Sequence, residues 1–300
     1  MSGISLLAAL GAMLTIATPL VFGALGAVVN ERAGILNLGI EGTMYAGAFV
    51  GFVAAQRSGS LWVGVLCAVA AGAVAGALMA LLTVTIGVNQ HVAGIGTTLA
   101  LVAACDYTNR LLYRTGSLAR SPKFSRWFGG HDLFGQFPPT YIALAVIAPL
   151  VWWVLRATGA GLRLRAVGEN PEAADVAGIS VSATRWAALV AGGVLMAAGG
   201  AFLTLARLGS FTIDIVSGRG WVCIALVIFG RWGVWPTVGG ALLFGFADAL
   251  QLQLAITSQF GGVPNEVMIA VPYLVVIAAL VVFGRGIRYP GAYMRPYRRA

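Results

Sequence analysis

Charged residues are scarce in this sequence, and their scarcity excludes most classes of soluble protein. Only 10% of the 300 residues are charged, whereas a soluble domain carries about a quarter. Hydrophobic residues make up 59% of the chain, and the mean hydropathy is +0.88. These values exclude an ordinary soluble enzyme and a disordered chain, and they predict an integral membrane protein.

Residues that carry chemistry are also few. The two histidines lie far apart, and each of the three cysteines, Cys67, Cys105 and Cys223, lies inside an apolar run without C-x-x-C spacing. The sequence contains no motif for a phosphate-binding loop, a catalytic zinc site or an activated serine. We therefore expect the cysteines to be packing residues. We also expect a chain that binds no metal or other cofactor itself and that moves a solute rather than converting it.

Acidic residues are outnumbered by basic ones, 10 to 19, which gives a formal net charge of +9. All but one of the basic residues are arginines. In a soluble chain this balance would suggest a nucleic-acid partner, but in a membrane protein basic residues collect in cytoplasmic loops and ends. We therefore interpret the charge as topological and expect no nucleic-acid partner.

Apolar runs long enough to cross a bilayer occur along the whole chain. At roughly 20 residues per span, its length allows about eight to ten helices. The predicted fold is all-α: a single polytopic transmembrane domain over residues 1–300, with some broken or re-entrant segments. The expected spans are Ile4 to Val29, Ala33 to Ala55, Leu61 to Gly87, His91 to Tyr113, Thr140 to Leu155, Trp186 to Ala206 and Val267 to Phe283.

Glycine patterns refine this map. Gly72 and Gly76 have the small-xxx-small spacing that lets helices approach closely. The second span is expected to be entered through a broken segment, and the runs Gly220 to Gly230 and Val234 to Ala247 are expected to form a pair of short helices. Residues 42–52 can also be aligned with residues 236–246, with three identities in eleven positions, which suggests an internal repeat.

Arginine clusters orient the predicted spans. The tail at residues 285–300 has five arginines. A polar segment at about 157–184 contains Arg163 and Arg165 and is flanked by Arg156 and Arg185. The positive-inside rule places both in the cytoplasm. Counting spans backwards then places the loop at about 114–138 and the N-terminus on the outside. This placement conflicts with the same rule, because the loop and its flank carry Arg110, Arg114, Arg120, Lys123 and Arg126.

A polar island from Arg163 to Ile179 is the most informative segment. Asn170 suits an N-cap, Pro171 the first helical position, Glu172 the positive end of a helix dipole, and Gly178 a left-handed stop. These residues predict one short surface helix of about seven residues, with small side chains that let its backbone enter a groove on another protein. The alternative is a solvated loop with a well-capped turn.

Two motifs in this sequence resemble those of a known family. The segment GENPEAADVAGI, Gly168 to Ile179, resembles the cytoplasmic coupling motif of permease subunits in ATP-binding-cassette importers, in the branch of branched-chain amino acid, ribose-type sugar and nucleoside permeases. The run NERAGILNLGIEGTMYAGAFVG, Asn30 to Gly51, resembles the nucleoside and simple-sugar members. The likeness covers nearly the whole chain, with the motifs in the expected order.

This resemblance implies a permease subunit that moves a nucleoside, or a related small hydrophilic solute such as a simple sugar, across a bacterial inner membrane. It implies three partners: a cytoplasmic ATPase that binds ATP and magnesium, a second and different permease, and an extracytoplasmic binding protein or lipoprotein. The residues that match the coupling motif have an expected mechanical role, not a catalytic one. They are Gly168, Glu169, Asn170, Pro171, Glu172, Ala173, Ala174, Ala177 and Gly178.

Polar residues inside spans are the next candidates, because they are costly in a membrane and usually face a cavity or a partner. The alternative is structural: a charge pair of Glu31 with Arg32, and amides and hydroxyls that bond neighbouring helices. Three tryptophans, Trp221, Trp232 and Trp235, are expected to be interface anchors. The candidates for the translocation pathway are Glu31, Asn37, Glu41, Asn89, Gln90, Thr97 and Thr98.

A second class of function stays open at this point. An ion-coupled secondary carrier or channel would work without an ATPase and would use Glu41, Asp106 or Asp248. Asp106 also departs from the more apolar pattern of nucleoside-type relatives, so the residues do not choose between nucleosides, simple sugars and other solutes. A membrane enzyme has no plausible catalytic set in this sequence.

Overall fold

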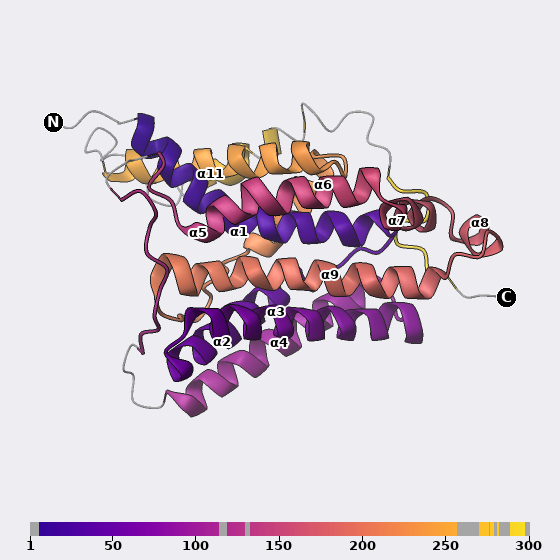
Figure 1. Ribbon diagram of the computed structural model, residues 1–300, viewed down its shortest axis with the longest axis horizontal. Helices are drawn as coiled ribbons and strands as arrows, with labels where there is room; N and C mark the ends of the chain where they lie inside the picture. The colour runs from indigo at the N-terminus through magenta and orange to yellow at the C-terminus, as the bar shows by residue number, and fades with distance from the viewer. Residues whose placement is uncertain are drawn as a thin grey trace.

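The computed structural model describes residues 6–113, 119–129, 133–256, 270–275, 277–278, 281 and 289–297. Every regular element in these ranges is helical (Figure 1), so the prediction of an all-α fold is confirmed. The longer helices are α1 (Leu6–Arg32), α2 (Ile40–Ser58), α3 (Leu61–Ala80), α4 (Gln90–Leu112), α9 (Val181–Phe202) and α11 (Val234–Ile256). The shorter ones are α5 (Pro138–Tyr141), α6 (Ala148–Ala157), α7 (Gly159–Glu169), α8 (Pro171–Val176) and α10 (Arg219–Phe229).

Several helices continue through a π-helical turn, which lengthens the apolar stretch. The turn at Leu81–Ile86 extends α3, and the turn at Leu203–Leu208 extends α9. The turn at Ile142–Ile147 joins α5 to α6. Within the described ranges, four stretches are then long and apolar enough to cross a membrane, as expected for a multi-pass protein. They are Leu7–Arg32, Leu61–Ile86, Pro138–Ala157 and Val181–Leu208.

The remaining predicted spans have different outcomes. α2, α4 and α11 have 19, 23 and 23 residues, and α10 is a short helix of 11, as predicted. The prediction of a second short helix from Val234 was wrong, because α11 is continuous. Pro236 lies in its first turn, where a missing N–H is tolerated. The span expected from Val267 to Phe283 lies mostly outside the described residues.

Close packing through glycine holds the helices together. α9 packs against α1, α2 and α3, and α1 also packs against α11. A Cβ added at Gly72 would lie 2.3 Å from the Gly193 carbonyl oxygen, and one at Gly76 would lie 2.3 Å from that of Leu189. The small-xxx-small spacing on α3 is therefore confirmed as the contact with α9.

The second predicted span is broken, as expected. α1 ends at Arg32, and α2 begins only at Ile40, so residues 33–39 form a non-helical link. Side chains of α4 hold this link through its backbone: Leu36 N donates to Gln90 Oε1 at 2.8 Å, and Thr98 Oγ1 donates to the Leu38 carbonyl oxygen at 3.0 Å. Irregular backbone is tolerated in a membrane protein where such partners satisfy its polar groups.

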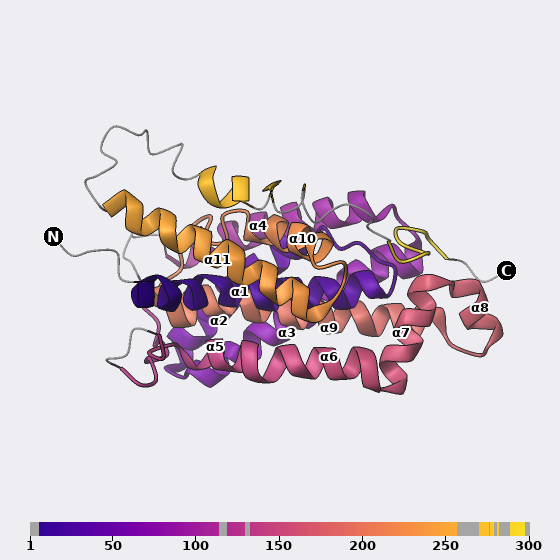
Figure 2. The same ribbon diagram turned by 90° about the horizontal axis from the view of Figure 1, so that it is seen from above.

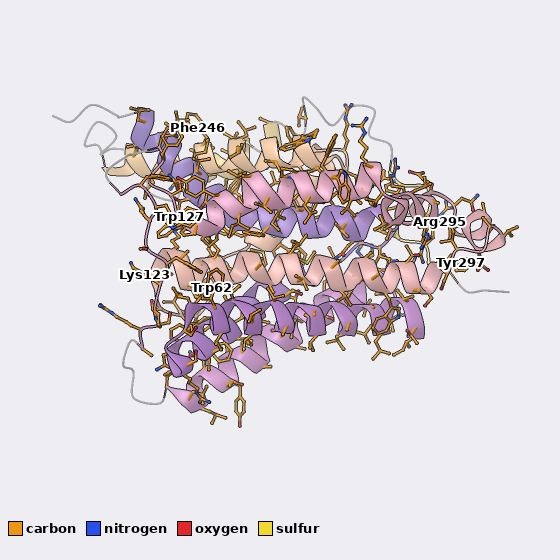
Figure 3. All side chains as sticks on the ribbon, viewed as in Figure 1. Trp62, Lys123, Trp127, Phe246, Arg295 and Tyr297 are labelled. Carbon is orange, nitrogen blue, oxygen red and sulfur yellow. The ribbon has the colours of Figure 1, made fainter. Side chains whose placement is uncertain are left out.

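The two ends of the bundle carry different segments. Figures 1 and 2 show α7, α8 and residues 289–297 at one end, which we call the α8 end, and the starts of α1 and α5 at the other. Figure 3 places Arg295 and Tyr297 at the α8 end, and Trp62, Lys123 and Trp127 at the opposite end. The described part of the loop at 114–138 therefore lies opposite the polar island at 157–184.

Candidate functional site

The polar island folds into a short capped helix at the α8 end. Asn170 Oδ1 accepts a hydrogen bond from Ala173 N at 3.0 Å, and Pro171 occupies the first position of α8, so the predicted cap is confirmed. Ala177 N donates to the Ala173 carbonyl oxygen at 3.1 Å, and Gly178 follows with a φ of 81°. This left-handed conformation favours glycine and ends the helix at the predicted residue. α8 has six residues, close to the predicted seven.

One face of α8 points away from the protein. Val176 is 92% exposed, although valine is normally buried. Glu172, Ala173 and Ala177 are exposed beside it. The opposite side is fixed by Ala174, which is 3% exposed and packs in a cluster with Val167 of α7 and Val181 of α9. The exposed face is therefore small, apolar and bordered by one carboxylate, which suits a shallow groove on another protein.

The other residues of the matched motif anchor this helix to the bundle. Gly168 is buried, and a Cβ there would lie 2.0 Å from the Arg32 carbonyl oxygen, so the backbone of α7 lies directly against the end of α1 at this position. Glu169 Oε2 accepts a hydrogen bond from Gly291 N at 3.1 Å. Of the nine predicted residues, three hold α8 in place: Gly168, Glu169 and Ala174. Pro171 is half-buried. The other five are exposed: Asn170, Glu172, Ala173, Ala177 and Gly178.

A C-terminal segment, residues 289–297, crosses the base of α7 and α8. Ala292 N donates to the Gly168 carbonyl oxygen at 2.9 Å, and Met294 N donates to that of Gly34 at 3.1 Å. Tyr297 Oη donates to Asp175 Oδ2 of α8 at 3.0 Å. From the sequence we predicted only a basic tail here. Its three tyrosines, spaced four residues apart among arginines, are the signal that it packs on the protein.

Glu31 joins this segment to the membrane helices. Its carboxylate is 1% exposed, and its Oε2 accepts hydrogen bonds from Trp232 Nε1 at 2.6 Å and Tyr293 Oη at 3.1 Å. Burial and the Glu31 carboxylate both raise the pKa of Tyr293, so this hydroxyl remains a donor. Arg32 Nε donates instead to the Trp232 carbonyl oxygen at 2.9 Å. A structural role for Glu31 is therefore supported, but the carboxylate bonds Trp232 and Tyr293 rather than the predicted partner Arg32.

Trp232 is not an interface anchor, so that prediction was wrong. Its side chain is 2% exposed, whereas Trp221 and Trp235 are 43% and 48% exposed. The cause is local: Arg231 and Trp232 have φ values of 49° and 57° in the turn between α10 and α11. This turn places the indole inside the bundle, where its N–H needs the acceptor that Glu31 provides.

Glu41 joins α2 to the beginning of α10. Its Oε1 accepts a hydrogen bond from Gly218 N at 2.8 Å, and its Oε2 accepts one from Gly220 N at 2.6 Å. A carboxylate at the N-terminus of a helix satisfies free N–H groups and favours the helix dipole. Glu41 therefore fixes α10 beside the broken segment at 33–39.

The other five pathway candidates lie around the same break, and four of them bond the backbone. Asn37 Oδ1 accepts from Gly39 N at 2.9 Å, and Gln90 and Thr98 hold the link as described above. Asn89 is exposed and caps α4 by accepting from His91 N at 2.9 Å. Thr97 is 3% exposed, and its hydroxyl has no hydrogen-bond partner among the described residues.

The remaining two acids that an ion-coupled carrier would use also have partners. Asp106 Oδ1 accepts a hydrogen bond from Tyr45 Oη, which joins α4 to α2. Asp248 of α11 interacts electrostatically with Arg207. Together with the two hydrogen bonds to Glu41, the contact with Tyr45 gives two of the three acids, Glu41 and Asp106, a structural role.

Comparisons with known proteins agree with this arrangement. Residues 9–280 match the family described as "Branched-chain amino acid transport system / permease component". The nucleoside ABC transporter permease protein NupC of Lactococcus lactis is 34% identical over 90% of each chain. The putative glucose ABC transporter permease protein TsgC13 of Haloferax volcanii is 34% identical over 97% of each chain. The guanosine ABC transporter permease protein NupQ of Bacillus subtilis is 32% identical over 91% of this chain and 90% of that relative.

Proposed function

Since the chain belongs to the permease family of branched-chain amino acid transport systems, we propose that it is the membrane-spanning subunit of an ATP-binding-cassette importer for a nucleoside or a simple sugar. The observation that carries this proposal is the capped helix α8, which presents an exposed apolar face beyond the bundle. A nucleoside is the preferred solute, because NupC and NupQ are named for nucleoside and guanosine transport. A simple sugar is the second candidate, because TsgC13 is named for glucose transport.

The proposed partners at the two ends of the bundle follow from the segments found there. A cytoplasmic ATPase docks on α8 and binds ATP and magnesium, so this chain itself catalyses no reaction. A second permease completes the pathway, and an extracytoplasmic binding protein or lipoprotein delivers the solute to the end that carries the loop at 114–138. The importer lies in the inner membrane of a bacterium, with the α8 end in the cytoplasm.

An unbroken series of contacts connects α8 to the membrane helices. α8 is fixed to α7, and α7 contacts the end of α1 at Gly168. The C-terminal segment ties the same region to Glu31, and Glu31 holds Trp232 in the turn before α11. We infer that closure of the ATPase shifts α7, α8 and the C-terminal segment together, and that this shift moves α1 and the turn between α10 and α11.

The break between α1 and α2 lies directly beside this route, because Met294 N of the C-terminal segment donates to the Gly34 carbonyl oxygen at 3.1 Å. Glu41, Gln90 and Thr98 hold residues 33–39 and the start of α10 by hydrogen bonds to backbone. Discontinuous helices of this kind form solute sites in many transporters. We propose that Glu31, Asn37, Glu41, Asn89, Gln90, Thr97 and Thr98 shape the pathway by positioning this backbone, without all of them touching the solute.

Co-purification tests the proposed assembly. The chain is tagged, extracted from its native membrane in mild detergent, and the proteins that accompany it are identified by mass spectrometry. We expect an ATPase with a phosphate-binding loop and a second permease. Recovery of this chain alone, repeated under gentler extraction, would contradict the assembly and favour a self-sufficient carrier.

A further inference from the structure

A large groove lies between α6, α7 and α9 on the outer surface of the bundle. Its volume is about 990 Å³, and Val29 of α1 contributes to its wall. Figure 1 shows α6 and α9 running alongside each other, with α1 between them. The walls are mostly apolar, with Leu150 and Val154 on α6 and the small residues Ala187 and Ala191 on α9. None of the residues assigned above to the pathway lines this groove.

The end of the groove near α8 is polar and positively charged. Arg163 of α7 and the hydroxyl groups of Ser180 and Thr184 line it there. Arg163 is exposed, and the described residues offer it no hydrogen bond or ion pair. Trp152 and Trp153, near the end of α6, are 37% and 52% exposed. Exposed tryptophans beside arginines mark the level of the lipid headgroups.

The dimensions of the groove fit the inner half of a bilayer. Its wall on α6 extends from Ile147 to Leu155, which spans about 12 Å at the helical rise of 1.5 Å per residue. One leaflet contributes about 15 Å of hydrocarbon, half of the core thickness. With Trp152 and Trp153 at the level of the headgroups, the apolar part of the groove would lie at acyl-chain depth and Arg163 at phosphate depth.

We propose that this groove binds one anionic phospholipid, with an acyl chain between α6 and α9 and its phosphate on Arg163. A helix of another subunit in the same place would cover the guanidinium with apolar side chains and leave its charge uncompensated, which is costly. A phosphate provides both the charge and the acceptor oxygens that Arg163 lacks. The lipid then touches α7, which carries α8, and couples the headgroup composition of the membrane to the position of that helix.

Native mass spectrometry of the intact purified complex tests this binding. The complex is exchanged into micelles that contain phosphatidylglycerol or phosphatidylethanolamine, and the retained lipids are counted. We expect Arg163→Gln to lower the preference for phosphatidylglycerol about fivefold, since one arginine near the surface contributes about 1 kcal/mol to binding an anionic lipid. The matched control is Arg156→Gln, which removes an exposed arginine at the same level that does not line the groove.

A second variant tests the apolar part of the groove. Ala191→Phe fills it, and we expect loss of the retained lipid regardless of its headgroup. The proposal is overturned if Arg156→Gln and Arg163→Gln have equal effects, since the charge would then act only through the general surface. It is also overturned if no lipid is retained and Ala187→Cys cross-links to a second permease, since the groove would then be a subunit contact.

Discussion

Val176→Asp is expected to abolish uptake while the chain remains folded and inserted. Val176 of α8 is 92% exposed, so its side chain is not part of the packed interior. If α8 enters a groove on the ATPase, the new carboxylate becomes buried there without a partner. Such a charge costs at least about 2 kcal/mol, and therefore lowers affinity for the ATPase about 30-fold or more. The measurement is the amount of ATPase that co-purifies, together with uptake of labelled solute.

Two controls separate docking from general damage. Val176→Thr keeps the shape of the side chain and is expected to retain most of the uptake. Ser182→Asp adds a carboxylate at the exposed start of α9, outside the exposed face of α8, and is expected to retain the ATPase. Normal uptake by Val176→Asp, or equal loss in Ser182→Asp, would contradict docking through α8.

Gly168→Ala is expected to destabilise the chain by about 1–3 kcal/mol, the usual cost of overpacking. The added Cβ would lie 2.0 Å from the Arg32 carbonyl oxygen, which is backbone and cannot rotate away. α7 must then move off α1, and the hydrogen bond from Ala292 N to the Gly168 carbonyl oxygen is strained. The measurement is the temperature at which half of the detergent-solubilised chain aggregates, and we expect both this temperature and uptake to fall.

The same substitution elsewhere on α7 provides the control. Gly159 is the first residue of α7, and a Cβ there would meet nothing within 4 Å. Gly159→Ala should therefore leave stability unchanged or raise it slightly, because alanine favours a helix more than glycine does. Equal loss of stability in both variants would show that the contact of Gly168 with α1 is not the cause.

The sequence predicted the local features of the fold well, because their causes are local. Runs of apolar residues mark the helices, and Asn170, Pro171 and Gly178 define α8 through capping chemistry that depends on neighbours within four residues. Two motifs also identified the family that the comparisons show. The continuous helix α11 was missed because Asp248 ends the apolar run that begins at Val234, although the helix continues through this residue to Ile256.

The partners of buried polar residues were not predictable in the same way. Glu31 has Arg32 beside it in sequence, but its carboxylate binds Trp232 and Tyr293, which lie 201 and 262 positions away. Gln90 and Thr98 similarly bind the backbone of the broken segment rather than a neighbouring side chain. Which group satisfies a buried polar atom depends on packing between distant segments, and a single sequence does not contain that information.

Uptake into vesicles tests the central claim most directly. This chain is reconstituted with its co-purified ATPase and permease, the binding protein is added outside, and labelled nucleosides and simple sugars are supplied with or without ATP trapped inside. We predict accumulation of one of these solutes only with trapped ATP, and none with Val176→Asp. Accumulation without ATP, driven by a proton gradient across vesicles that contain this chain alone, would contradict the account.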